Sequence, residues 1–165
     1  MPLELVPVSV NTDGNFKATF LPATVTDPKS VAALVAATAK DLTYSLTAGG
    51  FNRALQESSV ADARLTLRNV LNRPGQVTET LELQYVYGDT GDIARVALAP
   101  YINGWIVARY AIPNETNWTV GQKVDIFSIH TGQQRKDAPT ANGMFTITQG
   151  IFLRGVTQLD VALTA

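Results

Sequence analysis

The sequence predicts a mainly β protein, an antiparallel β-barrel or sandwich with one flanking α-helix. Short runs of alternating apolar and polar residues recur along the chain, and this period of two is typical of strands with one buried face. Glycine and proline separate these runs, and only one stretch carries the signals of a long helix. Many short strands beside one helix favour a sheet with the helix packed against it. We expect residues 1–22 to form an N-terminal hairpin or arm and residues 23–165 to form a single β domain.

The N-terminal region predicts a hairpin and then the helix. Two alternating apolar sets flank a turn at Asp13-Gly14: Val6, Val8 and Val10 before it, and Phe16, Ala18 and Phe20 after it. Asp27 suits a helix N-cap and Pro28 the first helical position, so a helix is expected from there to about Lys40.

The middle of the chain predicts two strands joined by a turn. After a strand at 42–48 and a polar loop at 52–59, alternation returns at 61–68, and Pro74-Gly75 then marks a turn. The strand at 77–87 directs one apolar set inward: Leu81, Leu83, Tyr85 and Tyr87. If these strands pair, Arg64 or Arg68 lies opposite Glu82.

The remaining elements follow the same signals. A short helix capped by Asp92 is expected to turn Ile93, Val96 and Ala97 inward. Strands are expected at 105–111, 123–130, 143–149 and 151–163, with a long polar loop at 132–142.

The composition indicates self-assembly. Charged residues make up only 16% of the 165 residues and hydrophobic residues 45%, with a mean hydropathy of +0.06. An ordinary soluble domain is about 25% charged. Because interfaces are depleted of charge as cores are, we infer that part of the exterior is covered by other subunits. The start of the chain does not read as a secretory signal, and no apolar run is long enough to span a membrane, so no membrane anchor is expected.

The same composition argues against catalysis, cofactors and tight nucleic-acid binding. A net charge of −1 with interspersed signs gives no cationic stripe, and one histidine without cysteine cannot supply a zinc site. Asp89-Thr90-Gly91 matches a short aspartic-protease signature, but its neighbours Gly88 and Asp92 are typical of a polar turn after a strand. His130 lies near Ser128 in sequence without a nucleophile motif, and Arg135-Lys136 is followed by Asp137, as in a solvated loop tip. Four aromatic residues suit either a sugar-stacking platform or positions in the core and at subunit interfaces: Tyr101, Trp105, Tyr110 and Trp118.

The order of these motifs resembles the major tail (tail tube) proteins of long-tailed bacteriophages, especially those that infect actinobacteria. After the alanine-rich segment, the resemblance rests on KDLT (40–43), LTAGGF (46–51), RPG (73–75), LELQYVY (81–87), GWIVAR (104–109), GQKVD (121–125) and GQQRKDAPTAN (132–142). It covers residues 23–165. It implies a tail-tube-like β domain, assembly into rings (hexameric in the family) and stacking of rings into a hollow virion tail tube, built in the bacterial host cytoplasm.

The resemblance also implies the partners. A tape-measure protein fills the tube, terminator and tip proteins close it, and DNA passes through a neutral to acidic lumen without specific binding. The residues that we expect at subunit interfaces belong to the N-terminal hairpin and to three segments that join strands: Val8, Val10, Phe16, Phe20, Phe51, Asn52, Arg53, Arg73, Pro74, Gln134, Arg135 and Lys136. The alternatives are another virion structural protein (capsid decoration or baseplate), a carbohydrate-binding β-sandwich, and a small hydrolase that uses Asp89 or His130.

Overall fold

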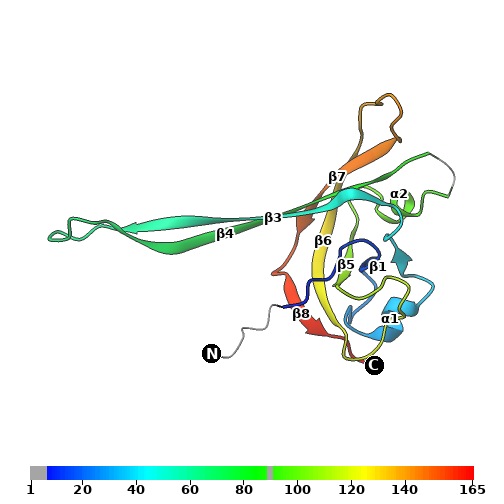
Figure 1. Ribbon diagram of the computed structural model, residues 1–165, viewed down its shortest axis with the longest axis horizontal. Coiled ribbons are helices and arrows are strands. Elements are labelled where there is room, and N and C mark those ends of the chain that lie inside the picture. The colour runs from blue at the N-terminus through cyan, green and yellow to red at the C-terminus, as the bar shows by residue number, and fades with distance from the viewer. Residues whose placement is uncertain (1–6, 89–90) are drawn as a thin grey trace.

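One curled antiparallel sheet organises the protein (Figure 1). The computed structural model describes residues 7–88 and 91–165. Its strands are β1 Phe16–Pro22, β2 Lys40–Asp41, β3 Leu46–Asp62, β4 Leu71–Val86, β5 Asn103–Tyr110, β6 Lys123–Lys136, β7 Thr146–Leu153 and β8 Gln158–Ala162. Their order across the sheet is β2-β1-β5-β6-β7-β4-β3, and β8 pairs with the first part of β6. The predicted mainly β, antiparallel class is confirmed, with two short helices, α1 Val31–Val35 and α2 Ile93–Ala97.

The main core fills the inside of the curl. Strand β4 contributes Leu81, Leu83 and Tyr85, each at most 2% exposed, on the face that the alternation predicts. Strands β1, β5, β6 and β7 contribute the residues that pack against them: Ala18, Phe20, Ile106, Ala108, Phe127, Ile129, Ile147 and Ile151. Ala94 and Leu98, from α2 and the residue that follows it, also belong to this core, as does Leu42, which follows β2.

A second, smaller core lies on the outer face of the sheet. Leu21, Val107, Val124 and Ile126 point outward from β1, β5 and β6. Three residues from other parts of the chain pack over them: Leu34 of α1, Trp118 and Leu163. Among the described residues, the outer face is therefore covered at the end of the sheet that holds β1, β5 and β8.

The expected long helix is wrong, and tertiary pairing explains why. Only Val31–Val35 is helical. At one end Val31 N donates to Thr164 O and Thr164 N donates to Lys29 O, both at 2.9 Å, which ties the chain to the C-terminus. At the other end Lys40 and Asp41 form β2 against β1. Asp27 Oδ1 accepts a hydrogen bond from Lys29 N in a local turn. These tertiary contacts override the helix propensity of the alanine-rich segment.

The expected N-terminal hairpin is also wrong within the described residues. Residues 7–15, which include Val8 and Val10, contain no strand, and Val6 lies outside the described residues. Strand β1 instead pairs along its whole length with β5, from Phe16↔Tyr110 to Pro22↔Gly104. Residues 16–22 are thus part of the sheet, and any arm before it is confined to the residues that precede Phe16.

Several strand boundaries differ from the expected ones. The expected strand at 42–48 is a turn, in which Ser45 N donates to Leu42 O, followed by the start of β3. Strand β6 continues beyond His130 to Lys136. The loop expected at 132–142 therefore begins at residue 137, five residues later than predicted. In place of the strands expected at 143–149 and 151–163, the last two strands are β7 and β8, separated by residues 154–157.

The helix at Asp92 is confirmed, and Ala97 packs against the main core as expected, but the other two residues expected to face inward do not. Asp92 occupies the N-cap position, and Ile93 and Val96 are exposed while Ala94 is buried. Side-chain amides fix this orientation: Gln134 Nε2 donates to Arg95 O at 2.9 Å, and Gln149 Nε2 donates to Leu98 O at 3.0 Å. These bonds satisfy carbonyls that the end of a helix leaves free.

Candidate assembly surfaces

Strands β3 and β4 leave the body as a long two-stranded ribbon, here called the arm (residues 52–80) (Figure 1). The pairing continues to Asp62↔Leu71, and residues 63–70 form the tip loop. The paired length from Asn52 to Asp62 is about 35 Å at about 3.3 Å per residue. The scaling of radius with length makes a body of about 130 residues roughly 36 Å across. The arm therefore reaches about as far as the body is wide.

The arm overturns four expectations. Residues 52–59 are strand rather than loop, 61–68 form the end of β3 and the tip loop, and Pro74-Gly75 lies inside β4. Glu82 lies opposite Asn52, far from Arg64 and Arg68. Pro74 is tolerated because the pairing shifts register at this point in a β-bulge.

Polar contacts hold the arm at three levels. At the root, Arg53 pairs with Glu79, and Thr157 Oγ1 donates to Glu79 Oε2 at 2.7 Å. At the bulge, Gln76 N donates to Ser58 Oγ at 2.8 Å. Near the tip, Asp62 lies 3.1 Å from Arg64 and 3.4 Å from Arg73.

The arm has no core of its own. Apolar side chains along it are about half exposed or more: Leu55, Val60, Leu65, Leu67, Val70, Leu71 and Val77. An isolated two-stranded ribbon is at best marginally stable in water. The arm also bears one end of the sheet, because β3 pairs only with β4 among the described strands. A long open edge with apolar residues needs a partner, or it aggregates.

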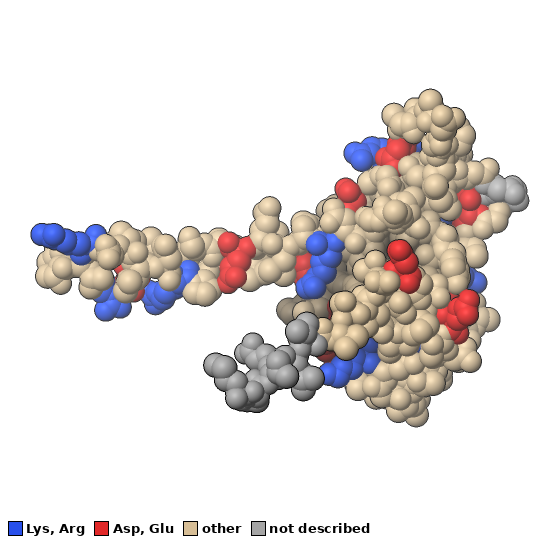
Figure 2. Space-filling model, viewed as in Figure 1, with Lys and Arg blue, Asp and Glu red and all other residues tan. Residues whose placement is uncertain are grey.

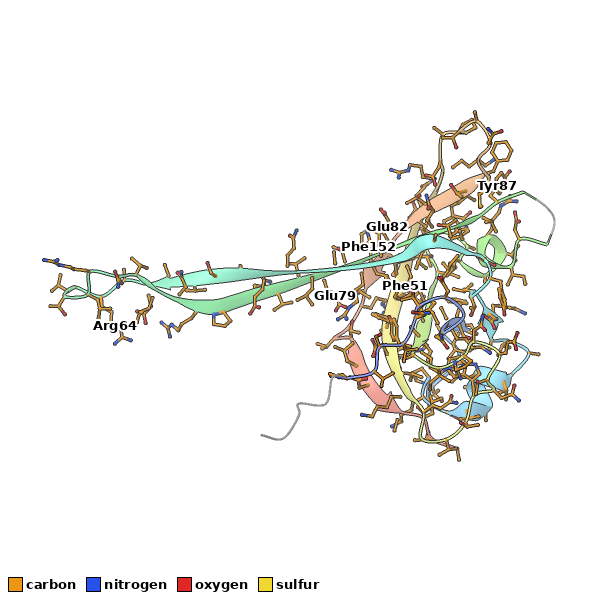
Figure 3. All side chains as sticks on the ribbon, in the orientation of Figure 1. Phe51, Arg64, Glu79, Glu82, Tyr87 and Phe152 are labelled. Atoms are coloured by element: carbon orange, nitrogen blue, oxygen red, sulfur yellow. The ribbon has the colours of Figure 1, made fainter. Side chains whose placement is uncertain are left out.

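A second exposed surface is the outer face of β3, β4 and β7 at the root of the arm, here called the open face. Residues in register across it share that side: Asn52, Glu82 and Gly150 form one row, and Gln84 and Thr148 belong to the next. Phe152 is its large exposed apolar residue, and Figure 3 labels it near Glu82. No helix covers this part of the described sheet, unlike the end that α1 covers.

The open face is polar, with little charge. Among the described residues of β3, β4 and β7, Glu82 is the charged group on this face at the root of the arm. Two charged residues reach the same side from the end of β6: Arg135, in register with Thr148, and Asp137. Asp137 Oδ2 accepts hydrogen bonds from Thr146 Oγ1, Thr148 Oγ1 and Gln84 Nε2 at 2.7, 2.8 and 3.0 Å. The bond from Thr146, with those from Thr148 and Gln84, holds the pKa of the Asp137 carboxyl below its ordinary value. The cluster holds a carboxylate on this face, with the Arg135 guanidinium 3.9 Å from it.

The expected interface residues separate into exposed and internal ones. Val8 is 93% exposed and Val10 52% exposed, ahead of β1. Arg73 and Pro74 lie on the distal arm, Asn52 on the open face, and Arg135 has an exposed side chain 3.9 Å from Asp137.

The other expected residues make contacts inside the subunit. Phe20 is 4% exposed in the main core, so its side chain is not available to a neighbour. Phe16 and Phe51 pack together with ring centroids 5.3 Å apart. Arg53 lies over Phe127 and pairs with Glu79, Lys136 lies 4.5 Å from the Tyr87 ring centroid, and Gln134 caps α2.

The residues proposed for other chemistries do not converge. His130 Nδ1 lies 2.7 Å from Asn103 Oδ1, on a sheet face that carries no acid–nucleophile arrangement among the described residues. Asp89 and Thr90 lie outside the described residues. Trp118 is buried, and Trp105 Nε1 donates to Val25 O at 3.2 Å, so the two tryptophans serve the second core. Across residues 7–88 and 91–165, no cluster of potential metal ligands is found. In the same ranges, no helix has the length and apolar character of a membrane span.

The arm's apolar residues were missed by sequence reasoning. Leu55, Val60 and Val77 alternate with polar residues, but glycine, proline and polar neighbours dominate the local pattern. A weak signal was present: two polar segments with β-branched residues flank a loop with Arg64 and Arg68.

A curled sheet with an open edge, a coreless arm and an uncovered face defines a structural subunit that other chains complete. The phage tail tube protein family matches residues 4–165, nearly the whole chain. This chain belongs to that family and is a structural component of the phage virion tail. No curated protein sequence matches it.

A solved structure agrees on the fold. One chain in the cryo-EM structure of the anti-feeding prophage baseplate, symmetrised sixfold, superposes with a TM-score of 0.54. The match covers 94% of this chain and 96% of that chain, at 14% identity. At this identity the likeness shows the shared fold.

Proposed function

We propose that this protein forms six-membered rings that stack into the tail tube, and that it has no catalytic activity. The observation that carries the proposal is the arm, whose apolar side chains and β3 edge are exposed in the single subunit. A patch that meets a different patch on the next copy gives a closed ring when the rotation closes. The β3 edge is suited to strand addition, which uses backbone hydrogen bonds as the joint.

The number six rests on the similar chain in a baseplate symmetrised sixfold. The residues that precede β1, with Val8 and Val10 exposed, form a second contact with a neighbouring ring in this proposal. Repeated contacts of this kind add up along a tube, so each one need be only modest.

We assign the open face to the lumen. Among the described residues, the row of Asn52, Glu82 and Gly150 and the row of Gln84 and Thr148 carry no cation of β3, β4 or β7. The neighbouring cation is Arg135 of β6, which is in register with Thr148 and lies 3.9 Å from Asp137. Tight phosphate binding requires several Lys or Arg, and the one arginine at this wall lies beside a carboxylate, so DNA passes without being held. A tape-measure protein contacts the same wall before ejection, and terminator and tip proteins contact the two ends of the tube.

Electron microscopy of the concentrated purified protein tests the proposal. Negative-stain images should show hollow tubes or stacked rings with sixfold end views. A single dispersed particle at every concentration, alone and with the other tail proteins, would contradict it.

A baseplate component is the second candidate, because the similar structure is a baseplate. It predicts isolated rings without stacking. Images that show rings but never tubes in the presence of the tape-measure protein would favour this candidate.

A further inference from the structure

A groove of about 690 Å³ lies where the curled sheet does not close on itself. One wall is the turn before β1, at residues 10–16, and the other is the segment 43–51 that leads into β3. Phe16, Phe51 and Tyr110 line it, and Phe16 lies 5.3 Å from Phe51 and 5.2 Å from Tyr110 between ring centroids. The groove thus has an aromatic lining at the seam of the subunit.

Backbone contacts hold the first wall in place. Asn15 N donates to Thr12 O at 3.1 Å, and Asn114 N donates to Gly14 O at 2.8 Å. Gly14 has a φ of 73°, in the left-handed region that favours glycine. The groove is therefore formed within the subunit, and its volume lies in the usual range of binding pockets, about 300–1,000 Å³.

The charge of the groove has one sign. Among the described residues that line it, Asp13 is the one that is charged at neutral pH. The part of the lining that the structure describes contains no lysine or arginine.

The tip of the arm has the complementary chemistry. Leu65 is fully exposed and Leu67 is about half exposed. The segment 60–76 carries Arg64, Arg68 and Arg73 against Asp62, a net charge of +2 (three minus one). Figure 2 shows the cationic residues gathered at the far end of the arm. Asp62 already pairs with Arg64 and Arg73, which leaves Arg68 to bind an acid elsewhere.

We propose that this groove receives the arm tip of a second copy of the chain, with Leu65 and Leu67 on the aromatic lining and Arg68 toward Asp13. The inference rests on the proposed function and names the contact that the arm makes in it. The tip cannot enter its own groove, because the arm projects away from the body that contains the groove (Figure 1). A reach comparable to the width of the body brings the tip to an adjacent copy.

Photo-crosslinking from the tip tests the assignment. Leu65 is replaced by benzoylphenylalanine, tubes are assembled from a mixture of ¹⁵N-labelled and unlabelled chains, and crosslinked peptides are mapped by mass spectrometry after irradiation. The proposal expects peptides that join the tip to residues 10–16 or 43–51 of a chain with the other label. Crosslinks that map to any other surface, or only within one chain, overturn it.

Two variants distinguish this contact from assembly in general. If Leu65→benzoylphenylalanine blocks assembly, the probe is moved to Leu67, with the same expectation. Asp13→Lys should raise the critical concentration for assembly by about threefold, the size expected of one exposed ion pair, and Asp13→Lys with Arg68→Glu should restore it. If wild-type tubes form but the double variant is no better than Asp13→Lys, the groove assignment fails while the proposed function stands. If the wild-type chain never assembles, the proposed function fails first.

Discussion

Replacing Arg109 by methionine should destabilise the unassembled protein by about 3 kcal/mol. Arg109 is fully buried, and its guanidinium donates to four acceptors: Pro113 O at 2.8 Å, Thr116 O at 3.0 Å, Gln122 Oε1 at 3.0 Å and Asn117 O at 3.3 Å. It also lies 4.8 Å from the Trp118 ring centroid. This one side chain therefore organises the loop at 112–122 that carries Trp118 over the second core.

The magnitude follows from the balance of lost bonds and regained solvation. Four hydrogen bonds to a charged group contribute at least about 6 kcal/mol at 1.5 kcal/mol each. No carboxylate pairs with Arg109 among the described residues, and burial lowers the pKa of its guanidinium. Because a buried cation costs several kcal/mol of solvation, removing it returns about half of the loss. The methionine keeps the contact with Trp118, so about 3 kcal/mol remains.

Thermal unfolding followed by circular dichroism measures this difference. At about 2–4 °C per kcal/mol for a chain of this size, Tm should fall by about 6–12 °C. Arg154→Met is the matched control, since Arg154 is exposed, and it should leave Tm unchanged. A fall of less than about 2 °C for Arg109→Met would refute the view that this cation organises the loop.

Three further predictions concern assembly and pH. Leu65→Ser with Leu67→Ser removes apolar burial worth about 3–5 kcal/mol per subunit contact, so the critical concentration for assembly, measured by sedimentation, should rise more than about a hundredfold. Val156→Ser is the control, at a 92% exposed residue outside the arm. An unchanged critical concentration for the double leucine variant would contradict the arm's role. Asp137→Asn should lessen the loss of folding stability in acid. Because the folded-state pKa of the Asp137 carboxyl is lowered, the carboxylate stabilises the fold above the ordinary pKa of 3.8, and this stabilisation is lost as pH falls through the folded-state pKa. Equal losses of unfolding free energy for variant and wild type during acid titration would count against this prediction. Glu82→Lys should let assembled tubes retain short DNA at low salt while wild-type tubes do not, as measured by co-sedimentation, and no retention would argue against a lumen position for the open face.

The sequence was sufficient to predict a strand and its inward face where only one face of the strand is buried. The strand that carries Leu81, Leu83 and Tyr85 was predicted with its inward face, because a core on one side and solvent on the other impose a period of two. The helix at Asp92 was placed by its cap, although its buried face depends on Gln134 and Gln149, which come from distant strands. Sequence periodicity carries no record of such partners.

The arm and the N-terminal half show what sequence alone could not give. Both faces of the arm are exposed in the subunit, so residues 52–59 lack a buried set and resemble a loop. Pro74 and Gly75 signal a turn in most contexts, but here the bulge opposite Ser58 absorbs them. The alanine-rich segment after Asp27 loses most of its helix to backbone bonds with Thr164, far away in the sequence, and to the pairing of β2 with β1.

We infer above all that copies of this chain cover the arm and the open β3 edge. Hydrogen–deuterium exchange of residues 52–62, compared between unassembled protein and assembled tubes, measures this cover most directly. We expect fast exchange at the outward amides of β3 in the free subunit and strong protection in the tube, with little change in the main-core strand β5. Equal exchange of residues 52–62 in the two states would contradict it.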